Sequence, residues 1–363
     1  MAEDGGGASG RADAPGPRPT MMDVAARAGV SQTTVSLVLN NSRGARLSAT
    51  TRQRVRAAAA ALGYSLPRRE VGRDSGRPEP SRTGTITFLA DEIIADPWCA
   101  MQLEGVREKA WQHGLTVSAL VSHGDADLEA SLLADALSRP LVGLIYATVL
   151  TRHIEPPPAL LAVPTVLLNC YALDHSLPSV VPGELLGGYT ATRVLLDAGH
   201  RRVAHIHGQS WTDPSRDRLR GYRRALAERD IPFDPALILP GNWEPPTGHA
   251  QTLKLMALPD PPTAIFAAND MMAVGVYDAL KELGLAIPGD VSVIGYDDRE
   301  IAQFLRPPLT TVVLPHHEMS CQAVEMLLDG APGSGSRQPQ VKVECPLVPR
   351  ASVAPPPARA NRR

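Results

Sequence analysis

The strongest constraint on the fold is an alternation, from Gly84 onward, of short apolar runs with longer segments of helical periodicity. The apolar runs predict strands at 85–90, 115–121, 142–147, 164–169, 202–208, 263–268 and 291–296. The segments between them predict helices at 100–113, 127–138, 187–198, 216–228 and 271–283. This alternation is typical of a doubly wound α/β domain with buried parallel strands, and such domains bind ligands at the carboxyl ends of their strands.

The N-terminal part has a different pattern, three short capped helices within residues 20–64. Thr20 and Asp23 resemble a capping box, and Gly29 supplies a tight turn because glycine is free to adopt positive φ. Ser31 and Ser48 are suitable N-caps for a second and a third helix. The three apolar faces consist of Val24, Ala25 and Ala28; Val35, Val38 and Leu39; and Val55, Ala58, Ala59 and Leu62. The pattern predicts a helix-turn-helix, although a generic helical hairpin has the same spacing.

Charge separates this N-terminal part from the rest of the chain. Between Arg18 and Arg69 there are nine arginines and one acidic residue, Asp23. The formal charge of the whole chain is −2, so the remainder is acidic on balance. A basic head on an acidic body indicates that the head contacts a polyanion, whereas a solvated arginine-rich surface is the alternative.

Several classes of protein find no support in the sequence. No apolar stretch approaches the roughly 18 residues of a membrane span, and the N-terminus lacks a signal-peptide core, so we expect a cytoplasmic protein without a membrane partner. Four scattered cysteines without a CxxC pair indicate buried thiols. His205 and His207 have the spacing of some metal sites, but satisfied strand histidines are the simpler interpretation. No catalytic motif is present, so we expect neither an enzyme nor a cofactor.

The residues themselves resemble a known family. DVAARAGVS at 23–31, TVSLVLN at 34–40 and LGY at 62–64 are similar to the DNA-binding head of the lactose-repressor (LacI/GalR) family of bacterial regulators. Four segments of the body, at 198–208, 218–226, 261–298 and 307–312, resemble the periplasmic-binding-protein-like domain of the same family. That domain has two lobes joined by three crossovers, with the effector between them.

The resemblance implies an order of domains along the chain. We expect an α/β protein with a disordered tail (1–18), a three-helix helix-turn-helix domain (19–65) and a hinge or linker (66–83). A two-lobed effector-binding and dimerisation domain (84–350) and a second disordered tail (351–363) follow.

If the resemblance holds, the helix at 31–39 enters the major groove. Gln32 and Thr33 match the family's base-reading positions, because short amide and hydroxyl side chains can bond base edges. The residues that match phosphate-binding positions or add affinity for the backbone are Thr20, Ser31, Thr34, Ser36, Asn40, Arg52, Arg54 and Arg56.

Two features depart from the family pattern at the DNA. Leu37 stands where many members have arginine, so it offers an apolar contact, most plausibly to a thymine methyl. In the hinge, Val71 is the only apolar candidate for the side chain that members of the family wedge into the minor groove. Arg68, Arg69 and Arg73 could instead track phosphates.

The resemblance also implies a set of effector contacts. These are Asp96, Trp98, Arg218, Trp243, Asn269 and Asp297. Flat aromatic rings pack on the apolar faces of a sugar, and arginine and carboxylate groups bond its hydroxyls. Other interpretations remain open: Asn269 and Asp270 could cap a helix, Asp298 could be a cap residue, and Trp98 and Trp243 could belong to lobe cores.

The effector set has two departures. Gly183 stands where the family places an aspartate, which leaves that role empty or shifts it to Glu184. Leu314 likewise replaces a polar residue of some members.

The function implied is a transcriptional regulator, most plausibly a repressor, that binds a pseudo-palindromic operator in double-stranded DNA as a homodimer. Its effector is expected to be a sugar, with a purine or another small molecule as the alternative. Two other functions fit the sequence less well. A sugar-transport protein would have a signal peptide and would lack the helix-turn-helix. An enzyme with a DNA-binding head would show a catalytic constellation, and none is visible in the sequence.

Overall fold

The computed structural model describes residues 21–30, 34–35, 38, 49–62, 84–93, 97–330 and 337–357. The chain divides into two compact units, Met1–Glu79 and Pro80–Arg363. The first unit is the basic head and the second is the body; each is described by itself below.

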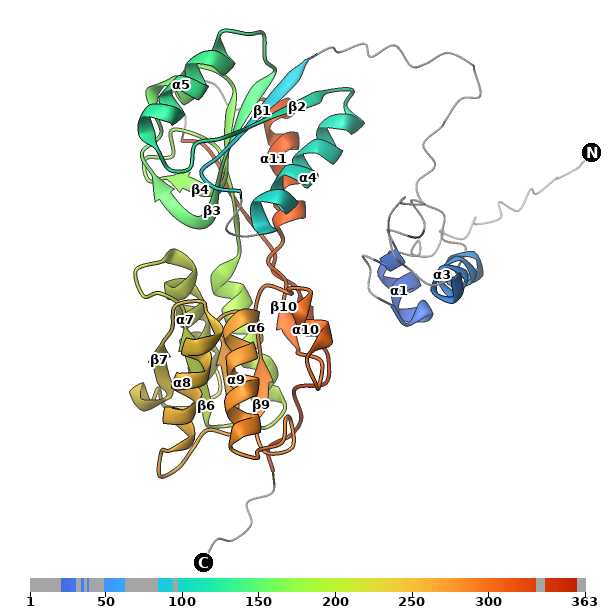
Figure 1. Cartoon of the computed structure of the whole chain (residues 1–363), viewed down its shortest axis with the longest axis vertical. Helices are drawn as coiled ribbons and strands as arrows, with labels where there is room; N and C mark the ends of the chain where they lie inside the picture. The colour runs from blue at the N-terminus through green and yellow to red at the C-terminus, as the bar shows by residue number, and fades with distance from the viewer. Residues whose placement is uncertain are drawn as a thin grey trace, which may run out of the picture. The chain divides into compact units, whose positions relative to one another are not determined.

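The head contains helices α1 (Met21–Ala28) and α3 (Ala49–Ala61) (Figure 1). Thr34, Val35 and Val38, between them in the sequence, are helical as expected. Gly29 ends α1 with φ of 62°, as the turn requires. The small core joins all three expected apolar faces: Val24, Ala25, Ala28, Val35, Val38, Val55, Ala58 and Ala59.

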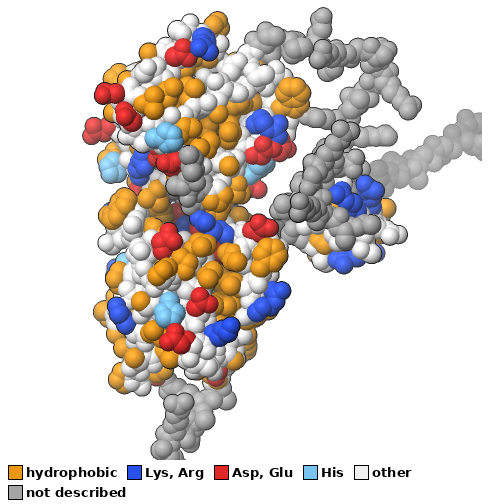
Figure 2. Space-filling model, viewed as in Figure 1, with side chains coloured by type: hydrophobic (Ala, Val, Ile, Leu, Met, Phe, Trp, Pro, Cys, Tyr) orange, Lys and Arg blue, Asp and Glu red, His pale blue; other side chains and the backbone are white. Residues whose placement is uncertain are grey.

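Arginine side chains lie at the surface of the head, whereas acidic and basic side chains are interspersed on the body (Figure 2). Arg54 has a local role that the sequence did not indicate. Its guanidinium donates to the carbonyls of Ala28 and Gly29 over 2.7–3.2 Å and so satisfies the last carbonyls of α1. The Arg54 guanidinium is thus partly used within the head, and its contribution to affinity for the DNA backbone stays a prediction.

The first lobe of the body is a parallel six-stranded sheet in the order β11-β5-β4-β3-β1-β2. Its strands are β1 (Thr85–Ala90), β2 (Thr116–Val121), β3 (Gly143–Ile154), β4 (Thr165–Ala172), β5 (Ser179–Pro182) and β11 (Gln340–Val343). Helices α4 (Pro97–Gln112) and α11 (His316–Asp329) pack on one face. Helix α5 (Ala126–Leu137) and the short η1 (Pro158–Ala162) cover the other face.

The second lobe is a parallel four-stranded sheet in the order β7-β6-β8-β9. Its strands are β6 (Val203–His207), β7 (Ile238–Pro240), β8 (Ala264–Ala267) and β9 (Ser292–Ile294), with η2 (Pro235–Leu237) before β7. Helices α6 (Glu184–Asp197) and α7 (Asp213–Ala227) cover one face, and α8 (Pro245–Met256) and α9 (Asp270–Glu282) cover the other. The short α10 (Ile301–Phe304) and an antiparallel pair, β10 (Thr311–Val312) and β12 (Leu347–Val348), complete it.

The chain passes between the lobes three times, as the resemblance implied (Figure 1). The crossings lie between β5 and α6, between β10 and α11, and between β11 and β12. Both sheets are built of parallel strands sandwiched by helices, so the expected two-lobed α/β architecture is confirmed.

Three details differ from the expectations. Strand β2 is an edge strand with partly exposed side chains, not a buried one, because it pairs only with β1. Helices α6 and α7 begin three residues earlier than their apolar patterns suggested. Residues 351–357 are not a disordered tail: the Ser352 side chain is buried, accepts a hydrogen bond from Thr310 N (2.8 Å) and donates to Val293 O (2.6 Å).

None of the helices in the described ranges is long and apolar enough to span a membrane.

Candidate functional site

A cleft of about 300 Å³ lies between the two lobes of the body, at the carboxyl ends of the strands. Of the six expected effector contacts it is lined by Trp98, Arg218, Trp243, Asn269 and Asp297. Asp96 lies outside the described residues. The other lining residues are Val149, Leu150, Thr151, Asn169, Glu184, Pro214, Asn242, Glu244, Met271, Arg299 and Leu314.

A buried ion pair forms the centre of this cleft. Arg218 of α7 donates to both carboxylate oxygens of Glu184 at the start of α6, with Nε–Oε2 of 2.7 Å and Nη2–Oε1 of 2.9 Å. Each side chain is only 3% exposed. The remaining Nη1 donates to the Ala268 carbonyl, and the guanidinium lies 3.6 Å over the Tyr296 ring. The arginine is therefore fixed by the protein before any effector binds.

Helices α6 and α7 come close enough for the ion pair between Glu184 and Arg218 because Gly188 has no side chain where the two helices contact each other. A Cβ on Gly188 would lie 2.5 Å from the Arg218 carbonyl oxygen. The sequence raised Glu184 only as a possible replacement for the missing aspartate at Gly183. The structure gives Glu184 a different principal role, which is to neutralise Arg218.

Asp297 completes the charged group. Its carboxylate lies 3.6 Å from Arg218 Nη1, and its backbone adopts φ of 106° while its N–H donates to Val312 O (2.7 Å). Burial raises the pKa of Asp297 well above its usual range, and the Arg218 charge opposes that rise. Asp297 therefore places a carboxyl group at the cleft beside the Arg218 guanidinium.

Two tryptophans border the charged group from opposite lobes. Trp98, near the start of α4, has its ring 5.0 Å from that of His316, and Arg299 lies 4.8 Å over it. Trp243 has φ of 75° and packs directly on Gly208, where a side chain would collide with the indole. The Trp243 Nε1 is buried without a hydrogen-bond partner among the described residues.

Asn269 lines the cleft but is mainly a helix cap. Its Oδ1 accepts from Met272 N (2.8 Å) at the start of α9, and its Nδ2 donates to Trp243 O (3.0 Å). The alternative left open by the sequence is thus correct, and one N–H of the amide is left for a ligand. Asp270 is buried and accepts from Thr311 Oγ1 (2.6 Å) and Arg299 N (2.7 Å).

Asp298 is also engaged within the protein, because its carboxylate accepts a hydrogen bond from Arg350 Nη2 (2.6 Å).

Sequence reasoning missed cleft residues in both lobes, among them Asn169 in the first lobe and Arg299 in the second. Asn169, with φ of 60°, donates through Nδ2 to the carbonyls of Thr148 and Val149, each at 2.9 Å. Its Oδ1 accepts from Thr151 Oγ1 (2.6 Å). A signal for Asn169 was available, because it ends an apolar run at the carboxyl end of a strand. Arg299 follows the recognised GYDD sequence directly and was also overlooked.

His205 and His207 do not form a metal site. The His205 ring stacks between Phe266 (4.4 Å) and Tyr222 (5.5 Å), and its Nδ1 lies 3.0 Å from the Phe266 carbonyl. The described residues contain no group of three or more possible metal ligands. His205 is thus packed between aromatic rings as a strand histidine, although its buried Nε2 has no hydrogen-bond partner among the described residues.

The expected DNA contacts are described only in part. Thr34 is helical and partly exposed, and Arg52 lies on α3 and is partly exposed. The following lie outside the described residues: Thr20, Ser31, Gln32, Thr33, Ser36, Leu37, Asn40 and, in the hinge, Val71.

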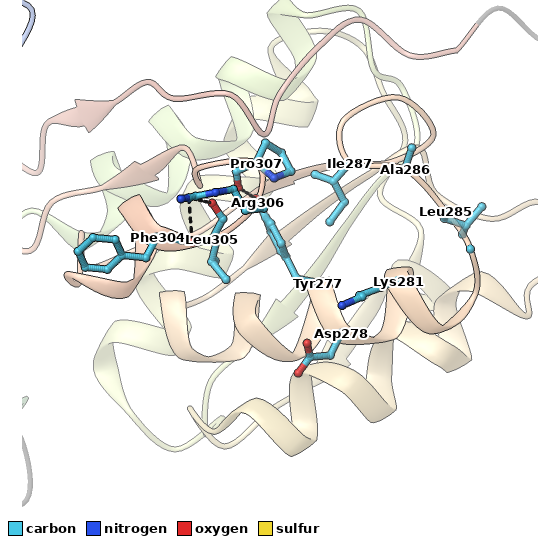
Figure 3. Close-up of a pocket in the computed structure, with 11 residues that line it drawn as sticks. Tyr277, Asp278, Lys281, Leu285, Ala286, Ile287, Phe304, Leu305, Arg306 and Pro307 are labelled. Carbon is cyan, nitrogen blue, oxygen red and sulfur yellow. Dashed lines mark hydrogen bonds between the residues drawn. The ribbon is translucent and has the colours of Figure 1, made fainter.

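A second cavity, of about 560 Å³, lies on the second lobe away from the cleft (Figure 3). It is bounded by α9, the loop that follows it and α10, with Tyr277, Lys281 and Phe304 among its lining residues. Tyr277 donates to the Pro307 carbonyl (3.1 Å), and Arg306 donates to the carbonyls of Phe304 and Leu305 (3.0 Å each). Tyr277 and Arg306 are thus engaged locally, whereas the charged groups of the first cleft converge on one space.

The comparisons with known proteins agree with this arrangement. Residues 20–66 match the model of bacterial regulatory proteins of the lacI family, and residues 192–353 match a periplasmic binding protein-like domain. The HTH-type transcriptional repressor PurR of Pectobacterium atrosepticum is 33% identical over 352 residues, which cover 95% of this chain and 99% of the relative.

Two solved structures are similar across nearly the whole chain. A complex of the transcriptional regulator CelR with cellobiose has a TM-score of 0.62 at 29% identity and covers 92% of this chain and 100% of its own. A lac repressor dimer bound to operator and the anti-inducer ONPF has a TM-score of 0.61 at 26% identity, with 93% and 100% covered. The chain belongs to the LacI family of bacterial regulatory proteins, and it is a DNA-binding transcriptional repressor with a small-molecule effector, not an enzyme.

Proposed function

We propose that the effector is a sugar of monosaccharide size, bound in the cleft between the lobes. The observation that carries this proposal is the pairing of two tryptophans, Trp98 and Trp243, with the buried group of Glu184, Arg218 and Asp297. Aromatic rings suit the apolar faces of a pyranose, and fixed charged groups suit its hydroxyls. The volume of about 300 Å³ is at the small end of the range for ligand pockets. CelR, which is 29% identical, was solved with cellobiose.

Contacts between the lobes support an effector that stabilises the closed form. The Tyr171 hydroxyl of the first lobe donates to Asp213 Oδ2 of the second (2.9 Å), and Arg299 lies over Trp98. A ligand that fills the cleft adds contacts to both lobes, so it favours the closed arrangement over an open one. Coupling of about 1–3 kcal/mol would change operator affinity five- to 150-fold.

The test is a binding panel of monosaccharides, disaccharides and nucleobases, read by thermal shift and calorimetry. A ligand present at about 100 times its dissociation constant adds about 2.7 kcal/mol of stability. We expect a monosaccharide to bind, and Trp98→Ala to weaken that binding at least tenfold. Trp211→Ala is the matched control, because Trp211 is 65% exposed and does not line the cleft. Binding of a nucleobase instead of every sugar would refute the sugar proposal.

For the DNA, the same proposal assigns base reading to Gln32, Thr33 and Leu37. Phosphate contacts are assigned to Thr20, Ser31, Thr34, Ser36, Asn40 and Arg52. Selection from random DNA tests this assignment: we expect a site with twofold symmetry, and Leu37→Arg should change the preferred base at one position of each half-site. An unchanged profile for that variant would remove Leu37 from the set.

A twofold operator needs two heads, so the proposal includes a homodimer. The rim of the second cavity is a suitable surface, because Phe304 is 58% exposed there (Figure 3). Ile301, on the same short helix α10, is 38% exposed. Sedimentation should report a dimer that Phe304→Glu dissociates. Leu173→Glu, at another exposed leucine, is the control. A monomeric wild-type protein at micromolar concentration would exclude this arrangement.

A further inference from the structure

A cluster of reactive side chains lies outside the cleft, on the first lobe where α4 and α11 pack together. His317 and Cys321 are one turn apart on α11, with Sγ 3.8 Å from the ring Nδ1. Glu108 of α4 lies on the other side of the ring, with Oε2 3.2 Å from Nε2. The thiol, imidazole and carboxylate thus follow one another in a row.

This order of groups argues against a metal site and favours an activated thiol. The sulfur faces one ring nitrogen and the carboxylate faces the other, so a single metal ion could not bind all three side chains through this imidazole. A nucleophile beside a base that is held by a third group is instead the arrangement that activates a thiol. The cluster is therefore suited to thiol chemistry.

The electrostatic surroundings maintain a positive charge between sulfur and carboxylate. The hydrogen bond with Cys321 is the largest cause that raises the pKa of His317 to about 9. Burial opposes the rise, and the charge interaction with Cys321 and then the Glu108 and Glu318 carboxylates add to it. Glu104, one turn before Glu108, adds to this field, since His317 helps to lower the pKa of Glu104. The neighbouring cations are already paired, Arg107 with Glu104 and Lys109 with Glu325.

Access separates Cys321 from the other three cysteines. Cys99, Cys170 and Cys345 are buried, and burial raises the pKa of each to about 12. Cys321 is partly exposed. Of the four thiols, a soluble reagent therefore reaches Cys321 most readily. Cys321 is also the thiol that lies beside the His317 ring.

We propose that Cys321 reacts with peroxide through the thiolate form of its side chain, with His317 and Glu108 as its positioning residues. The sulfur attacks one oxygen of hydrogen peroxide, so that the S–O bond forms as the O–O bond breaks. The departing hydroxide takes a proton from the His317 imidazolium and leaves as water. Sulfur is oxidised to sulfenic acid and the peroxide is reduced.

The test treats the reduced full-length protein with hydrogen peroxide at pH 7 and traps sulfenic acid with dimedone. Peptide mass spectrometry then gives the rate at each cysteine. We expect Cys321 to be labelled first, and His317→Gln to slow its labelling about tenfold, because a free thiol is only a few per cent thiolate at pH 7. Glu108→Gln should slow it about threefold. Glu104→Gln, one turn away on the same helix, should change the rate by less than twofold.

A second variant tests the same proposal without changing His317, so it can be used if His317→Gln does not fold. The double substitution Cys321→Ser with Gln322→Cys moves the thiol one position along α11, to a partly exposed site with Glu318 in place of His317 one turn before it. We expect this thiol to react about tenfold more slowly than Cys321. Equal rates for the two thiols, or preferential labelling of the buried cysteines, would overturn the proposal.

Discussion

The two lobes contribute different chemistry to one cleft. The first lobe provides neutral groups, Trp98, Thr151 and Asn169, whereas the charges belong to the second lobe. These charges are Glu184, Arg218, Asp297, Arg299 and Glu244. The charged network is held together within one lobe, by bonds that do not depend on closure. The second lobe is therefore preorganised to select the effector, and the first lobe covers it.

The largest expected effect comes from breaking the charged network. Glu184→Ala leaves the buried Arg218 without its partner, so we expect the free energy of unfolding to fall by about 3–5 kcal/mol. Urea denaturation of the body measures this change. Replacing both partners by apolar residues, Glu184→Leu with Arg218→Met, should restore most of the loss. A loss below about 1 kcal/mol for Glu184→Ala would mean that the network is not the centre of the second lobe.

The next largest effect is the loss of stability at acid pH, to which one buried histidine in each lobe contributes. Burial lowers the pKa of His205 in the second lobe and of His316 in the first lobe to about 3. Both are neutral when folded and gain a proton on unfolding below about pH 6.5, so stability is lost as the pH falls through that value. Each should cost about 2 kcal/mol at pH 5 relative to pH 7.

Urea denaturation at several pH values measures this loss. His205→Gln and His316→Gln should each reduce the loss of stability between pH 7 and pH 5 by about 2 kcal/mol. If only one variant does so, the two lobes differ in acid sensitivity.

The smallest effect concerns the contact between the lobes. Tyr171→Phe removes the hydrogen bond to Asp213, and we expect effector affinity to fall about fivefold, or about 1 kcal/mol. Tyr189→Phe is the control, because its hydroxyl donates to Glu228 (2.6 Å) within the second lobe. Calorimetry with the effector found in the panel compares them. Equal affinities for both variants would show that this contact does not hold the lobes closed.

The sequence predicted local features better than pairings between distant segments. Parallel strands are marked by short apolar runs, so all seven predicted strands are present, although β3 and β4 extend further than expected and β2 is more exposed. The resemblance to the family implied that Trp98, Arg218 and Asp297 contact the effector, and the structure places all three at the cleft between the lobes.

The sequence could not predict which side chains from distant segments bond to one another. The bond between Glu184 and Arg218 depends on how closely α6 and α7 approach, which no local pattern encodes. Asn269 was ambiguous because a helix cap and a ligand contact use the same amide. The row of Glu108, His317 and Cys321 joins helices about 200 residues apart, so spacing could not indicate it.

The three crossings also determine when the lobes can be completed during synthesis. Helix α11, which supplies Met319, Ala323 and Val324 to the core of the first lobe, follows almost the whole second lobe in the chain. Strand β11, at the edge of the first sheet, emerges later still. Although the first lobe begins earlier on the ribosome, it must wait for β11, and the second lobe must wait for β12 and Ser352, so neither lobe is complete before nearly the whole chain has been made.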